Sequence, residues 1–336
     1  MTALNFPTKA FVTGANGAIG SALTKRLSHL GWEVAALVRP GSEATHLTHL
    51  AGVEIVRGEL GDAAALATGC CDRDAVFHLA ALVHADPGTS EAQFQRVNAE
   101  GTRLLAEAAV KARVARFVYF STVAVYPASG MVMDENSVVA PESPYGRSKL
   151  DGERVVMSTT PRMGVTILRL PVVYGPHDRG NVARLIQAIR GGKFALAGDG
   201  RNVKSMLALD NAIDAAVLVA TDARAVGATY VVTDARDYTQ VEIAETIAEI
   251  LGKSRRFLKL PLRPMIVLAR LADAFSSISG MRLPLTVDRV TKLATSARYS
   301  GARLRTELGF IPRQELREGL IQQIEAMPPR NRAGPG

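Results

Sequence analysis

A glycine-rich turn near the N-terminus constrains the fold more than any other feature of the sequence. The apolar run Ala10–Thr13 leads into Thr13-Gly14-Ala15-Asn16-Gly17-Ala18-Ile19-Gly20, and a helix is expected near Ser21–Leu30. In such a strand–turn–helix unit, backbone N–H groups and the positive end of the helix dipole face an anion, and glycines allow close approach. The spacing is G-x-x-G-x-x-G, so a plain tight turn is the alternative. At the start of the first βαβ unit we interpret it as a dinucleotide cradle. The residues expected to form the cradle are Gly14, Asn16, Gly17, Ala18, Ile19 and Gly20.

The rest of the first half alternates short apolar runs with helical patterns. Such alternation is typical of βαβ units and a parallel sheet. We therefore predict an α/β fold, a Rossmann-type doubly wound parallel sheet with a smaller mixed α/β lobe toward the C-terminus. Further strands are expected at Glu33–Val38, Val53–Arg57, Ala75–Leu79, Arg116–Phe120 and Val165–Leu170. Further helices are expected near Ala63–Thr68, Glu91–Lys111 and Ser148–Met157.

The chain changes character after its first half. The turn-rich segment Tyr174-Gly175-Pro176-His177-Asp178 follows the last of these strands, and later elements are shorter and more mixed. This change predicts a dinucleotide-binding domain over 1–175, to which 205–230 returns, and a substrate-binding lobe over 176–204 and 231–325. The tail 327–336, rich in Pro, Gly and Arg, is predicted to be disordered.

Composition argues against several classes of protein. The two cysteines, Cys70 and Cys71, are adjacent and cannot build a disulfide framework, so a reducing compartment, the cytoplasm, is expected. We expect no signal segment and no membrane partner, because no apolar run reaches the roughly 18 residues of a span. The apolar stretch Pro261–Ala274 is interpreted as core of the small lobe rather than as a membrane anchor, and it could also bound an apolar substrate pocket. His46 and His49 have no third ligand nearby, so no metal site is expected.

The net charge of +8 is spread along the chain. It could indicate a nucleic-acid partner, but no basic tract is interleaved with aromatic residues, which make up 5% of the chain. We therefore expect no nucleic acid and attribute the excess of positive charge to an anionic small ligand.

A tyrosine and a lysine four residues apart indicate chemistry. On a helix, Tyr145 and Lys149 share a face. A free tyrosine has a pKa of about 10, so proton exchange near pH 7 needs a shift of roughly 3 units, about 4 kcal/mol. One ammonium roughly 4 Å away, at an effective dielectric constant of about 20, supplies on the order of 4 kcal/mol. The pair can therefore serve as proton donor and acceptor, although Tyr-x-x-x-Lys alone is also a common surface pair.

With the glycine turn and this pair in this order, the chain resembles the short-chain dehydrogenase/reductase superfamily, in its extended branch, the NAD-dependent epimerase/dehydratase family. The resemblance runs from roughly Lys9 to Leu320 in matching order. The segments that carry it are Val12–Gly20, Val76–Ala81, Asn98–Thr102, Ser121–Tyr126, Tyr145–Lys149, Leu168–Pro176, Gly198–Gly200 and Leu308–Phe310.

The resemblance implies roles for individual residues. Tyr145 would be the acid and base on the substrate oxygen, Lys149 would lower its pKa and hold the nicotinamide ribose, and Thr122 would bond the same oxygen. Hydride would pass between the nicotinamide and the carbon that carries this oxygen. Asn98 is expected to bond a backbone segment rather than to act on substrate. The rest of the coenzyme path would be lined by Glu59, Leu60, Leu79, Ala80, Ala81, Asn98 and Pro171, together with Tyr145 and Lys149.

The end of the second strand bears on the choice of coenzyme. NAD-preferring folds usually place an acidic residue there, which bonds the ribose 2′-hydroxyl. Here the strand ends in Arg39, which could hold a 2′-phosphate through charge-assisted hydrogen bonds. We therefore predict NADP as cofactor, with NAD as the alternative.

The substrate is harder to derive. Asn181 and Lys204 resemble the residues of nucleotide-sugar members that hold the nucleotide and its diphosphate, and His84 lies near the expected cleft mouth. We therefore expect a nucleotide sugar, with hydride transfer at C4 by a 4-ketoreductase or a 4-epimerase. Two departures from the family pattern leave an apolar ketone as the alternative, as in hydroxysteroid- and dihydroflavonol-type reductases: Lys204 stands where many members have Arg, and Val172 replaces an Asn.

A non-catalytic dinucleotide sensor is a further alternative. Such proteins usually lack the Tyr or the Lys, whereas Thr122, Tyr145 and Lys149 are all present here. Resemblance alone implies a homodimer through the helices Glu91–Lys111 and Ser148–Met157.

Overall fold

A seven-stranded parallel sheet forms the centre of the computed structural model, which describes residues 7–83, 88–279, 290–291 and 295–328. All neighbouring strands pair in parallel. Across the sheet the strands are β12 (Ala228–Val231), β7 (Gly164–Leu170), β5 (Arg116–Thr122), β4 (Ala75–His78), β1 (Lys9–Thr13), β2 (Glu33–Val38) and β3 (Val53–Arg57). The strand order reverses direction between β4 and β1, which makes the sheet doubly wound and confirms the predicted fold class.

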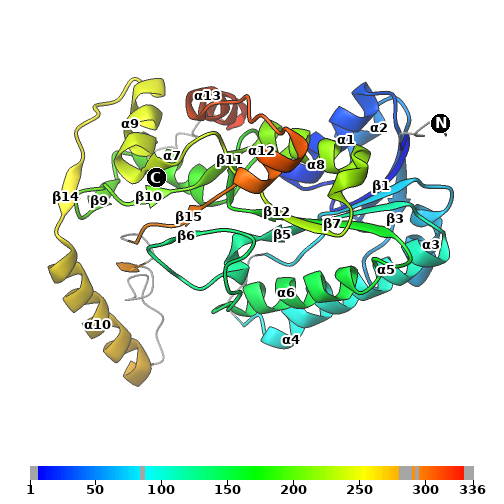
Figure 1. Cartoon of the computed structure of the whole chain (residues 1–336). Helices are drawn as coiled ribbons and strands as arrows, with labels where there is room; N and C mark the ends of the chain where they lie inside the picture. The colour runs from blue at the N-terminus through cyan, green and yellow to red at the C-terminus, as the bar shows by residue number, and fades with distance from the viewer. Residues whose placement is uncertain (1–6, 84–87, 280–289, 292–294, 329–336) are drawn as a thin grey trace.

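The central strands are apolar on both faces because helices cover both sides of the sheet. Phe11 of β1 packs into the core on one face, and Val12 packs into the core on the other. One layer of helices lies below the sheet and the other above it (Figure 1). The lower layer holds α3 (Ala63–Cys70), α4 (Glu91–Phe94), α5 (Gly101–Lys111) and α6 (Pro144–Met157). The upper layer holds α1 (Ala18–His29), α2 (Thr45–Thr48), α8 (Leu209–Thr221) and α12 (Ala302–Leu308).

A second, smaller core lies beyond the C-terminal ends of the strands. It is built on Tyr174, Ile186, Ile247 and Leu320, all fully buried. Its helices are α7 (Asn181–Arg190), α9 (Gln240–Ile250), α10 (Leu262–Ser279) and α13 (Leu316–Ala326). Its short strand pairs are β8 (Val172–Tyr174) with β11 (Met206–Ala208), β9 (Ala195–Ala197) with β14 (Leu258–Leu260), β10 (Val203–Lys204) with β13 (Tyr238–Thr239), and β6 (Val132–Met133) with β15 (Arg298–Tyr299).

Several expected boundaries differ from the structure. The helix expected at Glu91–Lys111 is interrupted by a π-helical segment, Gln95–Glu100, between α4 and α5. The helix expected from Ser148 begins at Pro144, because the Ser143 hydroxyl accepts a hydrogen bond from the Gly146 N–H and proline suits the first helical position. Tyr145 and Lys149 therefore both lie on α6.

The interpretation of Pro261–Ala274 as lobe core is wrong for its outer side. Val267, Leu268 and Leu271 of α10 are exposed, because that face of the helix points away from the rest of the lobe. Among the described residues, no helix is long and apolar enough to cross a membrane. His84 and residues 329–336 of the predicted tail lie outside the described residues.

Candidate active site

The glycine turn joins β1 to α1 at the point where the sheet reverses its connection. Gly14 has a φ of 70°, and a Cβ on it would lie 2.7 Å from the Ala80 backbone nitrogen. A Cβ on Gly20 would overlap the Gly14 carbonyl. The first turn of α1 carries no acidic residue. The turn therefore leaves the N-terminus of α1 open to an anion, and its residues fit the pyrophosphate of a dinucleotide.

Two arginines lie at the ends of adjacent strands beside this turn. Arg39 follows β2 and is exposed, and Arg57 is the last residue of β3, paired in register with Val38. The Arg57 guanidinium donates to the Ser42 carbonyl at 2.6 Å and to the Arg39 carbonyl at 3.4 Å. Arg57 thus braces the loop that carries Arg39 and adds a second positive charge. The sequence analysis did not single it out, although parallel register places the last residues of neighbouring strands together.

A chain of hydrogen bonds fixes the opposite wall of this turn. Thr102 donates its hydroxyl proton to the Asn98 carbonyl at 2.6 Å, so it accepts from His78 Nε2 at 2.8 Å. His78 Nδ1 then accepts from Thr13 Oγ1 at 2.7 Å, and Thr13 Oγ1 accepts from the Ala80 N–H at 3.3 Å. Burial and the Lys149 charge hold the pKa of His78 well below its usual value, so the ring is neutral. His78 is therefore a buried core residue with both ring nitrogens hydrogen-bonded.

Asn98 holds the segment after β4 against the helices. Its amide group accepts from the Leu82 N–H at 2.7 Å and donates to the Leu82 carbonyl and to Ser148 Oγ, both at 2.9 Å. This is the backbone-bonding role expected from the sequence. Asn98 lies in the π-helical segment, a conformation that is often found at functional sites.

Leu79, Ala80 and Ala81 belong to the wall that Asn98 holds, and Leu79 and Ala80 face Gly14 directly. Pro171 is buried at the end of β7. The Leu60 side chain lies in the core and packs against Gly101, whereas Glu59 is exposed.

Thr122 and Tyr145 meet at the end of β5. Thr122, expected just past this strand, is its last residue, and its hydroxyl lies close enough to the Tyr145 phenol to lower the pKa of that phenol. The pKa of Tyr145 is nevertheless raised to about 12, because burial outweighs the effect of Thr122. The expectation that Lys149 lowers the pKa of this tyrosine is therefore wrong for the protein chain alone. Tyr145 is a protonated phenol at neutral pH.

Lys149 is itself buried. Its side chain is 2% exposed, and burial lowers its pKa from 10.5 to about 7, against the opposing attraction of Glu153. The lysine is therefore only partly charged at neutral pH. Its Nζ lies 3.9 Å from the centre of the Tyr119 ring, which offers the ammonium an aromatic face.

A buried polar network lies behind these three residues. The Arg169 guanidinium forms a bidentate pair with Glu153, at 3.0 and 2.6 Å, and donates to the Tyr126 hydroxyl at 2.8 Å. Glu153 also accepts from Ser121, the residue before Thr122. The sequence analysis missed this network and Tyr119. Glu153 had a signal, since it stands four residues after Lys149 on the same helix face.

The expected substrate residues lie in the smaller lobe. Asn181 begins α7, is exposed, and accepts a hydrogen bond from Arg184 at 2.7 Å. The Lys204 ammonium donates to the Thr295 carbonyl at 2.6 Å. Val172 is 41% exposed. Among the described residues, no group of three or more metal-ligating side chains comes together.

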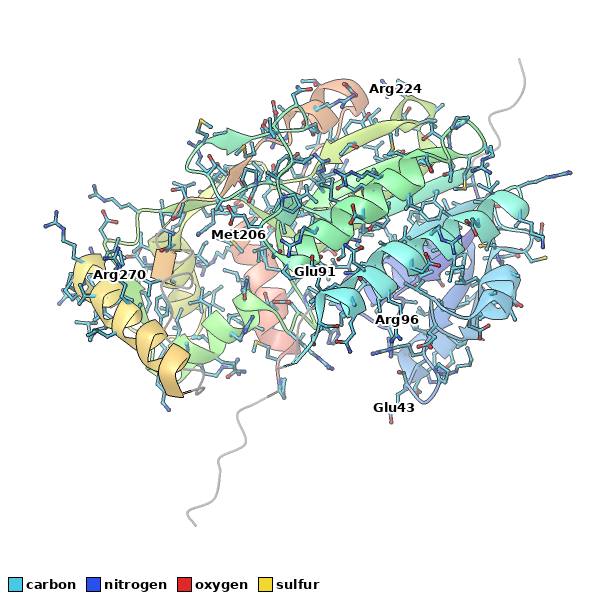
Figure 2. All side chains as sticks on the ribbon, turned by 90° about the horizontal axis from the view of Figure 1, so that it is seen from below. Glu43, Glu91, Arg96, Met206, Arg224 and Arg270 are labelled. Carbon is cyan, nitrogen blue, oxygen red and sulfur yellow. The ribbon has the colours of Figure 1, made fainter. Side chains whose placement is uncertain are left out.

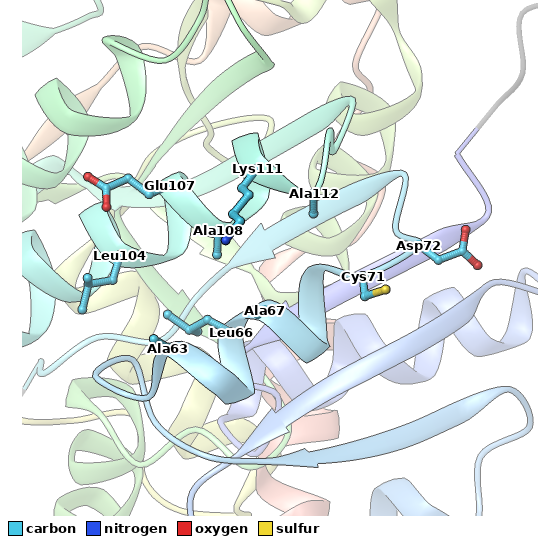
Figure 3. A pocket seen from close by; sticks show the side chains of 10 residues that line it. All are labelled: Ala63, Leu66, Ala67, Cys71, Asp72, Leu104, Glu107, Ala108, Lys111 and Ala112. Atoms are coloured by element: carbon cyan, nitrogen blue, oxygen red, sulfur yellow. The ribbon is translucent and has the colours of Figure 1, made fainter.

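A groove between α3 and α5 lies apart from these residues. Figure 3 shows that it is lined largely by small and apolar side chains, including Ala63, Leu66, Leu104 and Ala108, with Cys71 at one end. None of the expected site residues lines it, so it is not the candidate active site.

The chain is similar to known proteins in sequence and in structure. An undecaprenol-linked sugar epimerase of Escherichia coli, N-acetyl-alpha-D-glucosaminyl-diphospho-ditrans,octacis-undecaprenol 4-epimerase, is 29% identical over 80% of this chain and 82% of its own. A ceramide reductase of Caulobacter vibrioides is 32% identical over 80% of this chain and 78% of its own. The structure of MoeE5 in complex with UDP-glucuronic acid and NAD is 29% identical, covers 95% of this chain and 98% of its own, and superposes with a TM-score of 0.75.

A model of a protein family matches most of the chain. The model of the NAD dependent epimerase/dehydratase family matches residues 10–233, which span the glycine turn, Thr122, Tyr145 and Lys149. The comparisons identify the chain as an enzyme of the NAD dependent epimerase/dehydratase family.

Proposed function

We propose that this enzyme transfers hydride at C4 of a nucleotide sugar, as a 4-ketoreductase or a 4-epimerase. The observation that carries the proposal is the Thr122–Tyr145 pair, which sets a protonated phenol beside a second hydroxyl at the C-terminal edge of the sheet. Two hydroxyls held together can position one substrate oxygen, and the phenol can donate a proton to it. The sugar assignment rests on the bound ligand of MoeE5 and on the substrate named for the Escherichia coli relative.

The residues of the chain have distinct tasks in this proposal. Thr122 fixes the substrate oxygen against Tyr145, and the neutral phenol gives its proton to a ketone oxygen. Burial lowers the pKa of Lys149 to about 7, so this lysine can exchange a proton near neutral pH, and it would hold the nicotinamide ribose. Gly14, Gly17 and the N-terminus of α1 would hold the coenzyme pyrophosphate. The coenzyme, when bound, supplies or accepts the hydride.

We propose NADP as the preferred coenzyme. Arg39 and Arg57 bring two guanidinium groups to the ends of β2 and β3, where a dinucleotide fold places the adenosine ribose. A 2′-phosphate there would gain charge-assisted hydrogen bonds that a 2′-hydroxyl does not make. NAD is bound in the MoeE5 structure, so NAD is the competing assignment.

A coenzyme assay tests both proposals. The purified enzyme is expected to lack tightly bound coenzyme and to oxidise added NADPH faster than NADH with a 4-keto nucleotide sugar. Stoichiometric retained NAD, with interconversion of C4 epimers and no net coenzyme consumption, would identify the epimerase. Absence of turnover with every keto nucleotide sugar would contradict the sugar assignment.

An apolar ketone is the second candidate substrate. Val172, which stands in place of an Asn of the family pattern, is 41% exposed at the start of β8, and the Lys204 ammonium donates to the Thr295 carbonyl. The ceramide reductase among the relatives is named for such a lipid-like substrate. Oxidation of NADPH with long-chain or aromatic ketones, but not with keto sugars, would favour this candidate.

A further inference from the structure

Helix α10 carries an apolar stripe on its outward side. Pro264, Val267, Leu268 and Leu271 follow the i, i+3, i+4, i+7 spacing that places residues on one helix face. All four are exposed, and the exposed fractions of Val267, Leu268 and Leu271 are 56%, 57% and 62%. On the opposite face Ala269 is fully buried. The helix is therefore apolar on both sides, although only one side packs on the lobe.

The segment that leads into this stripe is predominantly basic, although Asp273 follows it on α10. Residues 253–272 contain six basic residues and no Asp or Glu. All six are exposed, and Arg255 pairs with Glu249 at 2.7 Å. Arg263 and Arg270, seven residues apart, lie along one edge of the apolar stripe, and Figure 2 shows Arg270 at the outer end of the molecule. The basic residues are Lys253, Arg255, Arg256, Lys259, Arg263 and Arg270.

Among the residues that the structure describes, nothing covers this stripe, so it is accessible to a flat surface. The helix projects from the lobe, away from the seven-stranded sheet and from the glycine turn (Figure 1). It follows the edge strand β14, where Leu258 is also exposed, at 69%. The apolar stripe, Leu258 and the six cations thus form one continuous part of the chain.

We propose that α10 docks this enzyme on the surface of an anionic phospholipid bilayer. A helix with exposed leucines and valines flanked by arginines is suited to lie in the interface, with its apolar face between the acyl chains and its cations at the phosphates. Charge distinguishes between the two possible partners of this face, a second copy of the chain and an anionic membrane surface. A second copy of the chain, packed through the same face, would bring the six cations against themselves, whereas an anionic surface complements them.

This inference goes beyond the proposed function and does not depend on the substrate. The expectation of no membrane partner rested on the lack of a spanning segment, and a helix that lies on the surface needs none. Docking through α10 would hold the substrate-binding lobe, rather than the coenzyme end of the sheet, next to the bilayer.

Co-sedimentation with lipid vesicles tests the proposal on the full chain. The enzyme is expected to sediment with vesicles of phosphatidylcholine mixed with phosphatidylglycerol, to bind phosphatidylcholine alone more weakly, and to be released by salt. The double variant Leu268→Gln/Leu271→Gln is expected to lose at least about tenfold in partition, because two apolar side chains no longer enter the acyl region. The variant Arg263→Gln/Arg270→Gln is expected to lose about fivefold per arginine on anionic vesicles only.

A matched control separates the stripe from exposed apolar residues in general. Leu30→Gln/Ile311→Gln changes two residues that are 52% and 67% exposed, beside α1 and α12 in the upper layer of the molecule, and is expected to bind vesicles like the wild type. Unchanged coenzyme affinity in each variant confirms that it is folded. The proposal is overturned if the wild type stays in the supernatant with both vesicle types, or if the stripe variant sediments like the wild type. It is also overturned if the stripe variant loses an oligomer in solution while vesicle binding is absent throughout.

Discussion

Replacing Lys149 by methionine should stabilise the fold while abolishing activity. The Lys149 side chain is 2% exposed, and burial lowers its pKa from 10.5 to about 7. This difference of about 3.5 units, at 1.36 kcal/mol per unit, corresponds to about 5 kcal/mol by which folding disfavours the charged form. Methionine fills a similar volume without a charge, but it loses the contact with Tyr119 and the attraction of Glu153. We therefore expect a net gain of about 2 kcal/mol in the free energy of unfolding at pH 7.

The difference in stability between the variant and the wild type should depend on pH. Between pH 7 and 10.5 the unfolded lysine binds a proton that the folded lysine has largely lost, so the stability of the wild type rises with pH across this window. The variant lacks this contribution. Its advantage over the wild type should be largest at and below pH 7 and should shrink as the pH approaches 10.

Urea unfolding at pH 7 and at pH 9.5, followed by circular dichroism, measures the difference. Lys111→Met is the matched control, because Lys111 is exposed on α5, and it should show no pH-dependent gain. A Lys149→Met variant that is less stable than the wild type by the same amount at both pH values would refute the reasoning.

Three further predictions concern the cradle, the coenzyme and the buried network. Gly20→Ala should weaken coenzyme binding at least about a hundredfold in a fluorescence titration, because its Cβ would overlap the Gly14 carbonyl, whereas Gly130→Ala, whose Cβ meets open space, should bind normally. Arg39→Glu should weaken NADPH binding roughly 10- to 100-fold and NADH binding much less, and equal losses would remove the argument for NADP. Glu153→Gln should lower the free energy of unfolding by about 3 kcal/mol, because it leaves the buried Arg169 without its carboxylate, and an unchanged urea midpoint would contradict this.

The sheet was predictable because its strands are short apolar runs separated by helical patterns. The expected ranges Glu33–Val38 and Val53–Arg57 are observed with the same bounds, since both strands lie in the parallel sheet and end at polar turns. The π-helical interruption at Gln95–Glu100 was not predictable. A π-helical turn has no residue pattern of its own, and this one is stabilised by contacts of Asn98 with Leu82 and Ser148 from elsewhere in the fold.

The candidate site was also predictable only in part. The Tyr-x-x-x-Lys spacing placed Tyr145 and Lys149 on one helix, but the pKa values depend on burial, which the sequence does not give. The ring of Tyr119 reaches Lys149 from β5, and the carboxylate of Glu153 is held by Arg169 from β7. The outward stripe of α10 was mistaken for core, because composition alone cannot tell which apolar residues a lobe covers.

The central claim is that the Tyr145 phenol exchanges a proton with the substrate in a crevice that binds a nicotinamide dinucleotide. The measurement that tests it most directly is turnover and coenzyme affinity of Tyr145→Phe in one preparation. The account predicts a loss of about a thousandfold in kcat with a coenzyme Kd within about twofold of the wild type. Wild-type turnover in this variant would contradict it.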